Sequence, residues 1–151
     1  MSNTIVRKAD WHDDMVDIMR IREAVFINEQ NVPPEQEWDE LDATKAIHFL
    51  AVDGIYAMGT ARLIPEEHKQ ARISRVAVLK DWRGLHVGDA LLNTLIAEAT
   101  KQNYTTLSLT AQKYAIPFYQ RFGFEVVSDE FVEVGIPHVE MRRSQQQCEN
   151  L

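Results

Sequence analysis

The sequence has little of what marks extracellular, membrane-spanning or nucleic-acid-binding proteins. It holds one cysteine, Cys148, so no disulfide can form within the chain, and a cytoplasmic location is expected. No run of about 18 apolar residues is present, so no membrane-spanning helix is expected, and residues 1–8 lack the apolar core of a signal peptide. The net charge of −7 lacks the basic excess that nucleic-acid binding needs.

Metal-binding patterns and internal repeats are also missing. The five histidines are scattered without metal-ligand spacing, and the acidic stretch 35–42 lacks the pattern of a calcium loop. We therefore expect no metal, no nucleic acid and no membrane among the partners, and the negative charge is compatible with a small cationic substrate. The length fits a single domain over residues 1–143, followed by a polar, frayed tail, 144–151. A homodimer stays open as an assembly.

The hydrophobic pattern predicts a mixed α/β fold in which helices flank a central twisted sheet. Strands are expected at 4–8, 47–52, 55–64, 72–79, 105–110, 125–134 and 139–142. Helices are expected from 10 to before 32, at 87–102 and at 116–122, and loops include the turn Asp53-Gly54 and residues 65–68. Within the strand 72–79, one face should carry Ile73, Arg75 and Ala77, and the other Ser74, Val76 and Val78.

The turn at 83–88 leads from this strand into the long helix. A helix N-terminus offers unpaired N–H groups and the positive end of the helix dipole, so it binds anions. Gly84 and Gly88 would let a phosphate approach the backbone, and Arg83 can add a charge-assisted contact. The turn is neither a Walker loop nor a dinucleotide fingerprint. A plain strand-to-helix turn, in which the glycines serve geometry only, is the other interpretation.

Two segments carry motifs with a family resemblance. Val76-Ala77-Val78, followed by Arg83-Gly84-Leu85-His86-Val87-Gly88, resembles the acetyl-CoA-binding motif Arg/Gln-x-x-Gly-x-Gly/Ala of the GNAT superfamily of N-acetyltransferases. The segment 115–124, with Tyr119 and the closing Gly123-Phe124, resembles the second motif of that family. The ends of the chain are similar to the narrower ElaA-like subgroup, through Arg22-x-x-Val25-Phe26-Ile27-x-Glu29-Gln30-x-Val32-Pro33, Glu37-x-Asp39-x-x-Asp42 and Gly135-Ile136-Pro137-His138.

The resemblance implies an acetyl-CoA-dependent N-acetyltransferase with a GNAT-like mixed sheet whose fourth and fifth strands splay apart. The turn at 83–88 would wrap the pyrophosphate, and the gap between the splayed strands would take the thioester. The acceptor would be a small-molecule or peptide amine. The cofactor contacts implied are Val76, Ala77, Val78, Arg83, Gly84, Leu85, His86, Val87, Gly88, Gln112 and Phe118.

Acetyl transfer needs a base for the amine, a donor for the developing oxyanion and a proton for the thiolate. The resemblance places Tyr119 near the sulfur, where a neutral phenol can assist the thiolate, although an aromatic at this spacing could also be a packing residue. The backbone N–H of Val78 is a candidate oxyanion donor. The base stays open among Glu29, Glu35, Glu37, His138 and a water chain that ends at one of them.

Two positions depart from the family motif. His86 stands where the family has a glycine, and it is either a further phosphate contact, with helical dihedrals, or an exposed residue without a role. Asp89, in the first helical turn, would repel a pyrophosphate, so we expect it to point away. The strand 72–79 also lacks the early carboxylate that many relatives use as a base.

The acceptor contacts implied are Phe26, Glu29, Gln30, Glu37 and His138. The acidic stretch 35–42 has two interpretations, a solvated charged loop or a wall that attracts a cationic amine. Two functions therefore remain: an enzyme that acetylates an amine, and a catalytically silent acyl-CoA-binding sensor or partner module.

Overall fold

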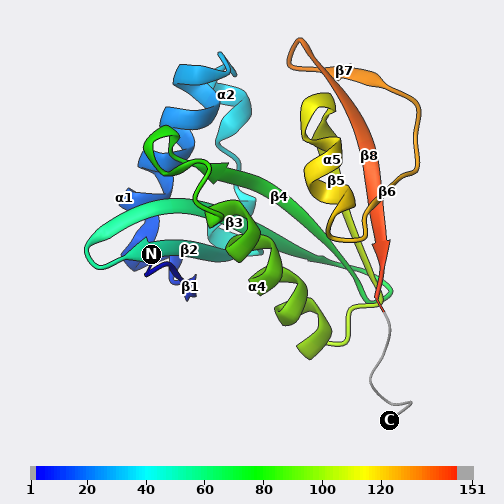
Figure 1. Cartoon of the computed structure of the whole chain (residues 1–151), viewed down its shortest axis with the longest axis horizontal. Coiled ribbons are helices and arrows are strands. Elements are labelled where there is room, and N and C mark those ends of the chain that lie inside the picture. Colours follow the sequence, from blue (N-terminus) through cyan, green and yellow to red (C-terminus); the bar gives the residue numbers. More distant parts are fainter. Residues whose placement is uncertain (1–2, 146–151) are drawn as a thin grey trace.

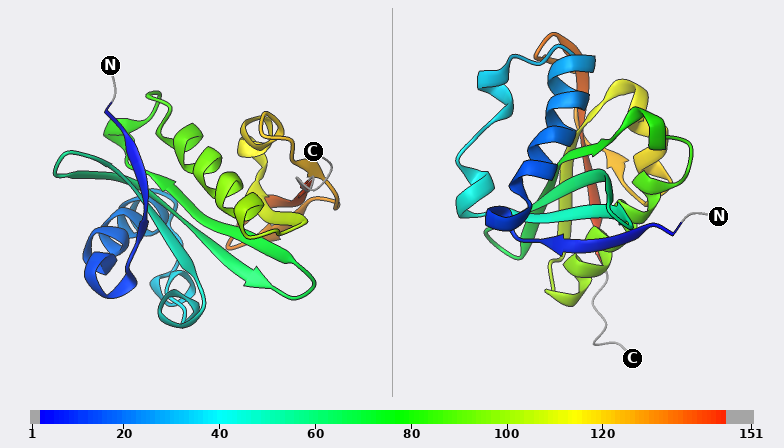
Figure 2. Two further views of the ribbon diagram at one scale, coloured as in Figure 1. Left: turned by 90° about the horizontal axis from the view of Figure 1, so that it is seen from below. Right: turned by 90° about the vertical axis from the view of Figure 1, so that its left-hand side faces the viewer.

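A mixed sheet with helices on both faces forms the part of the chain that the computed structural model describes, residues 3–145 (Figures 1 and 2). The strands are β1 (Ile5–Ala9), β2 (Ile47–Asp53), β3 (Tyr56–Glu66), β4 (Gln70–Val78), β5 (Thr106–Gln112), β6 (Glu125–Val126), β7 (Phe131–Glu133) and β8 (Ile136–Ser144). The helices are α1 (Trp11–Arg22), the π-helical η1 (Glu23–Glu29), α2 (Pro34–Glu37), α3 (Leu41–Thr44), the 3-10 turn η2 (Lys80–Trp82), α4 (Val87–Lys101), the 3-10 turn η3 (Lys113–Ala115) and α5 (Ile116–Gln120). The strand order is β1-β2-β3-β4-β5-β8-β6, with β7 paired to β8.

The sheet opens in its middle, between β4 and β5. These neighbours run parallel and pair only at residues 70–72 with 106–108, whereas β4 pairs with β3, and β5 with β8, over much longer antiparallel stretches. Beyond Arg72 the ribbons of β4 and β5 diverge, as Figure 1 shows. The expected splay of the fourth and fifth strands is therefore confirmed, and the C-terminal half of β4 is left without β5 as a partner.

Two apolar layers hold the helices to the sheet. On one face α4 buries Val87, Leu91 and Leu95 at the helical spacing that the sequence predicts. On the other face α1 buries Ile18 and Ile21. The left-hand view of Figure 2 shows α4 and α1 on opposite sides of the sheet. Both long helices are thus anchored, and the residues at their ends are held firmly around the opening between β4 and β5.

A bulge at Arg75 changes which face the later residues of β4 present. Arg75 has a φ of 55°, and the pairing of β3 with β4 shifts register between Thr60 and Arg62. Ile73 packs into the core on the α4 side, but Ala77 packs into the core on the α1 side. The prediction that Ile73 and Ala77 share a face was wrong, because one extra residue reverses the alternation of a strand.

Several predicted boundaries also differ from the structure. The first helix continues past Arg22 as a π-helical turn, and α2 and α3 follow where only loop was expected. Strand β3 runs through Pro65, which was placed in a loop. Since β2 ends opposite Leu63, Pro65 lies where one side of β3 is an open edge, and a proline is tolerated there. The predicted strand 125–134 is divided into the short β6 and β7.

The predicted polar tail begins later than expected. Ser144 belongs to β8. The backbone N–H of Gln145 donates to the Thr105 carbonyl at 2.8 Å, and its side chain donates to Thr100 Oγ1 at 3.0 Å. Residues 144 and 145 are therefore tied to the domain rather than frayed. The rest of the predicted tail, with Cys148, lies outside the described residues.

Candidate active site

Two cavities meet in the opening between β4 and β5. The first, here called the α4 cleft, has a volume of about 850 Å³ and lies at the start of α4. The second, here called the inner cavity, has a volume of about 560 Å³ and lies between β4, β5, β8 and the segment after α1. Both are lined by Gln30, Val76, Gln112, Tyr114, Ala115 and Tyr119. The shared lining makes the junction of the two cavities a point where two ligands can touch.

The α4 cleft gathers most of the predicted cofactor contacts. Its lining includes Val76, Ala77, Val78, Arg83, Gly84, His86, Val87, Gly88, Gln112 and Phe118. Leu85 is the exception, since it is 48% exposed and does not line the cleft. The sequence pattern therefore predicts this surface well, although the role of each residue toward a ligand stays a prediction.

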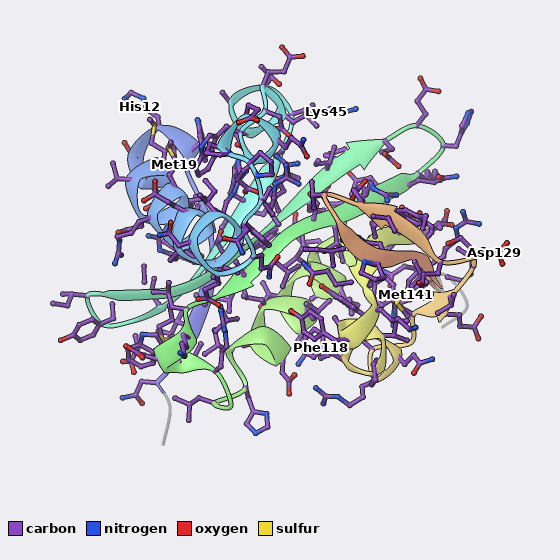
Figure 3. The ribbon with its side chains drawn as sticks, turned by 90° about the horizontal axis from the view of Figure 1, so that it is seen from above. His12, Met19, Lys45, Phe118, Asp129 and Met141 are labelled. Carbon is purple, nitrogen blue, oxygen red and sulfur yellow. The ribbon has the colours of Figure 1, made fainter. Side chains whose placement is uncertain are left out.

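Glycine is favoured at positions 84 and 88 of the turn for two different reasons. Gly84 has a φ of 80°, and an added Cβ would meet nothing within 4 Å, so its backbone conformation is what favours glycine. A Cβ on Gly88 would lie 3.3 Å from the ring of Phe118, so here space is limiting. Phe118 lies beside the start of α4 (Figure 3). Gly88 thus keeps the first turn of α4 close to α5.

His86 and Asp89 lie differently from what was expected. His86 adopts a left-handed conformation, with φ 64° and ψ 22°, as the N-cap of α4, so the helical dihedrals considered for it were wrong. Its Nδ1–H donates to Asp89 at 3.0 Å. Asp89 lines the cleft instead of pointing away from it, and its second oxygen accepts from Arg121 at 2.9 Å. Arg121, which the sequence analysis missed, offsets the charge that would repel an anion.

Two contacts fix the position of the Arg83 side chain. Its Nε donates to the Val78 carbonyl at 2.9 Å, and its Nη2 lies 2.7 Å from the carboxylate of Glu29. Glu29 therefore borders the α4 cleft and does not line the inner cavity. A carboxylate that is paired with an arginine is a poor proton acceptor, so this geometry does not favour Glu29 as the base.

Tyr119 lines both cavities at their junction. Among residues 3–145, no group forms a hydrogen bond with its hydroxyl, while its ring packs edge-on against Phe118 and Phe124. Burial, with a smaller contribution from Tyr114, raises the pKa of the Tyr119 phenol far above its usual range. The side chain is therefore both a packed aromatic and a neutral hydroxyl donor without a protein acceptor.

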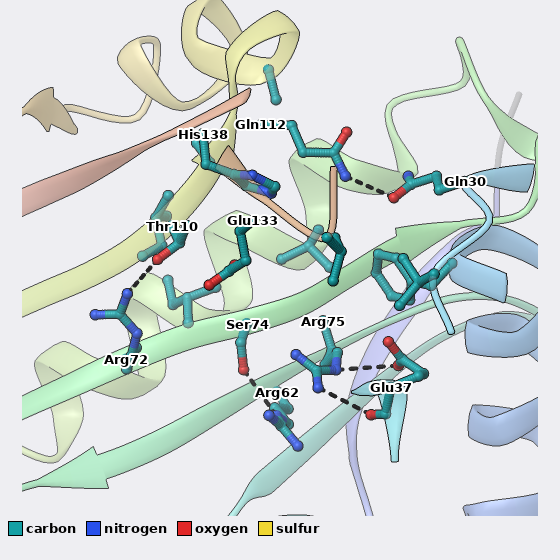
Figure 4. Close-up of a pocket in the computed structure, with 18 of the residues that line it drawn as sticks. Gln30, Glu37, Arg62, Arg72, Ser74, Arg75, Thr110, Gln112, Glu133 and His138 are labelled. Atoms are coloured by element: carbon teal, nitrogen blue, oxygen red, sulfur yellow. Dashed lines mark hydrogen bonds and ion pairs between the residues drawn. The ribbon is translucent and has the colours of Figure 1, made fainter. Parts of the chain in front are cut away.

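His138 lines the inner cavity, on β8 opposite Gln112 of β5. Its Nδ1 lies 2.7 Å from the Ile136 carbonyl. A carbonyl only accepts, so Nδ1 must carry the proton, and Nε2 is left as the basic nitrogen of the neutral ring. The ring, stacked on Phe131, points toward the cavity in Figure 4. The orientation of the imidazole is therefore fixed through Nδ1, and Nε2 has no hydrogen-bond partner among residues 3–145.

The acidic stretch 35–42 is neither a solvated loop nor an open acidic wall. Glu37 and Asp42 are 3% and 4% exposed. Arg22 donates to both of them at 2.7 Å, and Arg62 donates to Asp42 at 2.8 Å. Both expectations for this stretch were wrong for its two buried members, because arginines from α1 and β3 neutralise the carboxylates.

The remaining predicted acceptor residues reach the inner cavity from the segment after α1. Phe26, Gln30 and Glu37 line it. Gln112 donates to Gln30 at 2.7 Å across the opening (Figure 4). Glu133 also lines this cavity and was not predicted. The signal available for it was its place in the hairpin that carries His138, since β7 pairs with β8 through Phe131 opposite His138.

Comparisons with known proteins identify the family. A family profile described as "Acetyltransferase (GNAT) domain" matches residues 12–145. The chain belongs to the GNAT acetyltransferase family. It is 35% identical over 132 residues to the "Uncharacterized N-acetyltransferase YjcF" of Bacillus subtilis (strain 168), covering 87% of this chain and 93% of the relative. The crystal structure of Escherichia coli ElaA has a TM-score of 0.84 at 28% identity and covers 93% of this chain and 99% of its own. The resemblance to the ElaA-like subgroup is thereby confirmed.

The fold is also shared by a solved structure of low sequence identity. An aminoglycoside 6'-N-acetyltransferase complexed with coenzyme A has a TM-score of 0.72 at 15% identity, with 93% of this chain and 96% of its own covered; this likeness concerns the fold alone. Within residues 3–145, no cluster of three or more histidine, cysteine, aspartate or glutamate side chains is placed to hold a metal ion. In the same residues, no helix has the length and apolar character needed to cross a membrane.

Proposed function

We propose that the protein transfers an acetyl group from acetyl-CoA to a primary amine. The observation that carries the proposal is the position of Tyr119, which lines both cavities and offers a hydroxyl without a partner among the described residues. A thioester that enters through the α4 cleft would meet an amine held in the inner cavity at this residue. Membership of the GNAT family supports this reading of the site.

The α4 cleft fits the chemistry of CoA. The start of α4, a helix of 15 residues, offers unpaired N–H groups and a positive dipole end for the pyrophosphate. A Cβ on Gly88 would lie 3.3 Å from the Phe118 ring, so glycine at this position lets the first turn of α4 pack close to α5 beside the cleft. The half of β4 that β5 leaves unpaired can bond the amide groups of a pantetheine arm. We therefore assign Val76, Val78, Arg83 and the turn at 83–88 to the cofactor.

The reaction forms a bond between the amine nitrogen and the carbonyl carbon, and it breaks the carbon–sulfur bond. The amine gives up one proton and the departing thiolate gains one, so protons balance. Tyr119 would donate a hydrogen bond to the thiolate. Because burial raises the pKa of Tyr119, the phenol would keep its proton and act as a hydrogen-bond donor. The proton that the thiolate gains would then come from solvent, and the proton that the amine loses would pass to the base and on to solvent. The backbone N–H of Val78 is our candidate donor for the carbonyl oxygen as it gains charge.

His138 is the proposed base. Its Nδ1 is fixed by the Ile136 carbonyl, and its Nε2, which has no hydrogen-bond partner among residues 3–145, is left to accept a proton. Of the other candidates, Glu29 and Glu37 are each held by arginines, and Glu35 is exposed and lines neither cavity. A water molecule between the amine and His138 would serve the same route.

One observation favours the second candidate function, a silent acyl-CoA-binding module. β4 carries no carboxylate at all, and its bulge presents Arg75 to the inner cavity. If His138 were only structural, the inner cavity would hold no proton acceptor on β4 or β8. The protein would then bind acyl-CoA without catalysing transfer.

An amine panel separates the two functions. CoA thiol release from acetyl-CoA is measured with diamines, amino sugars, aminoglycosides and lysine peptides, and the acetylated product is identified by mass spectrometry. Amine-dependent thiol release with a matching acetylated product is the expected result. Saturable acetyl-CoA binding with no product on any amine would instead support the silent module.

A further inference from the structure

The arginines of the inner cavity already have carboxylate partners. Arg72 forms a two-pronged pair with Glu140, at 2.9 and 2.7 Å. Arg62 binds Asp39 and Asp42. These arginines are therefore not free to attract an anionic group of the acceptor.

Arg75 is also paired, although its Nε forms no hydrogen bond among the described residues. Its Nε lies 3.1 Å from the Glu37 carboxylate, and its Nη2 donates to the Glu37 carbonyl at 3.0 Å. Arg22, Arg62 and Arg75 thus face three carboxylates in one neutral group of ion pairs. Despite its arginines, the inner cavity has no excess of positive charge from these residues.

Glu133 is a cavity-lining carboxylate that has no arginine partner among the described residues. It lines the wall, and within residues 3–145 it has neither an ion pair nor a hydrogen bond through its side chain. Figure 4 shows its carboxylate directed into the cavity, between Thr110 and Arg75. Among the carboxylates that line the inner cavity, Glu133 is therefore the one that no arginine holds in an ion pair, although its charge acts on Arg72 through space.

The hairpin register fixes Glu133 relative to the proposed base. Phe131 lies opposite His138, and Glu133 lies opposite Ile136. Side chains two apart on a strand share a face, so Glu133 and His138 are diagonal neighbours, with their backbones roughly 7–8 Å apart. A bound amine can then present one nitrogen to His138 while another cationic group of the same molecule contacts Glu133.

We propose that Glu133 determines acceptor specificity by binding a second cationic group, so that diamines are the preferred acceptors. The inference rests on the proposed function, because it names the acceptor class of that same site. The amine that reacts must be neutral, whereas the anchored one stays protonated and pairs with the carboxylate. Glu133 is a binding residue in this scheme and takes no part in the chemistry.

The test compares three probes of equal chain length, 1,4-diaminobutane, n-butylamine and 4-aminobutanoate, on Glu133→Gln and wild-type protein. Asp129→Asn is the matched control, since it removes one negative charge nearby from a side chain that is exposed and projects outward in Figure 3. Glu133→Gln should lower kcat/KM for 1,4-diaminobutane about five-fold through KM, the size expected of an ion pair partly open to water. The value for n-butylamine should stay unchanged in all three proteins.

Two kinetic results would overturn the inference. One is an equal effect of Glu133→Gln on 1,4-diaminobutane and n-butylamine. The other is a preference of the wild-type protein for 4-aminobutanoate, which would mean that the arginines attract the acceptor after all. Either result leaves the proposed acetyl transfer intact.

A binding measurement covers the case in which no probe is acetylated. Calorimetric titration of 1,4-diaminobutane into the protein saturated with CoA should give binding that Glu133→Gln weakens and Asp129→Asn does not. That outcome would support the Glu133 site even though the proposed transfer had failed. Absence of binding to the wild-type protein would overturn the Glu133 site.

Discussion

Tyr119 has a property, a hydroxyl without a hydrogen-bond partner among the described residues, that its sequence motif does not predict. The motif at 115–124 is enough to predict an aromatic near the thioester. The unpartnered hydroxyl, by contrast, depends on the arrangement of α5, β5 and the turn after η1, which no local pattern encodes. Burial raises the pKa of the phenol, whose ring packs against Phe118 and Phe124, so the hydroxyl is a donor near neutral pH.

Replacing Tyr119 with phenylalanine tests this role. Tyr119→Phe keeps the ring and removes the hydroxyl, so kcat should fall about 10²–10⁴-fold while the affinity for acetyl-CoA hardly changes. Measuring kcat, acetyl-CoA affinity and the melting midpoint on one preparation separates this effect from a packing defect. Unchanged kcat on a confirmed acceptor would remove Tyr119 from the mechanism and leave it a packing residue.

His48 gives a prediction about pH and stability. Its ring is 2% exposed and stacks on Trp11. Its Nε2 lies 2.9 Å from the Asp42 carbonyl, while Nδ1 is buried and has no hydrogen-bond partner among residues 3–145. Burial lowers the pKa of His48, although the Asp42 carbonyl and carboxylate oppose the shift. Folding therefore favours the neutral ring, and the unfolded chain binds the proton more readily.

The sign of the pH effect follows from that difference. The stability contributed by neutral His48 is fully present above its unfolded pKa, about 6.5, and is lost as the pH falls from there through the folded pKa. The urea midpoint should thus decline as the pH falls below about 6.5. His48→Gln should make the midpoint flatter over this window, whatever its absolute level. An identical pH slope in wild-type and His48→Gln proteins would assign the decline to another group.

At the scale of elements, the bulge in β4 and the short helices after η1 form one unit. Arg75 is held at a positive φ, a conformation that costs a bulky residue roughly 1–3 kcal/mol and persists only when its surroundings fix it. Those surroundings are Glu37 at the end of α2 and the backbone beside it. Sequence periodicity could not reveal the bulge, because nothing in the pattern of β4 marks Arg75 as the extra residue.

Glu37→Gln tests whether this unit stabilises the fold. The change leaves Arg22 and Arg75 without their shared carboxylate, and breaking a buried ion pair from one side costs about 3–5 kcal/mol. Urea unfolding should show a loss of that order. Glu35→Gln, in the same short helix but exposed, is the control and should change the free energy of unfolding by less than about 0.5 kcal/mol. Equal, small effects of the two substitutions would mean that the ion pairs contribute little.

At the scale of the whole molecule, the sequence predicts more of the residues that line the α4 cleft than of those that line the inner cavity. The glycine-containing turn and the long helix are local features, so almost all predicted cofactor contacts line one cleft. The inner cavity is built from η1, β4, β5 and the β7–β8 hairpin, which come together only in the tertiary structure. The acidic stretch was therefore misjudged, and Glu133 was missed.

Thermal unfolding with and without millimolar acetyl-CoA tests whether the α4 cleft binds acetyl-CoA. A ligand at about 100 times its Kd stabilises the native state by about 2.7 kcal/mol, which predicts a rise of several degrees in the wild-type midpoint. The Cβ of Gly88→Val would lie 3.3 Å from the Phe118 ring and should push α4 and α5 apart at the turn, so a folded variant should show a much smaller rise. No rise for the wild-type protein, or the same rise for a folded Gly88→Val variant, would contradict the claim.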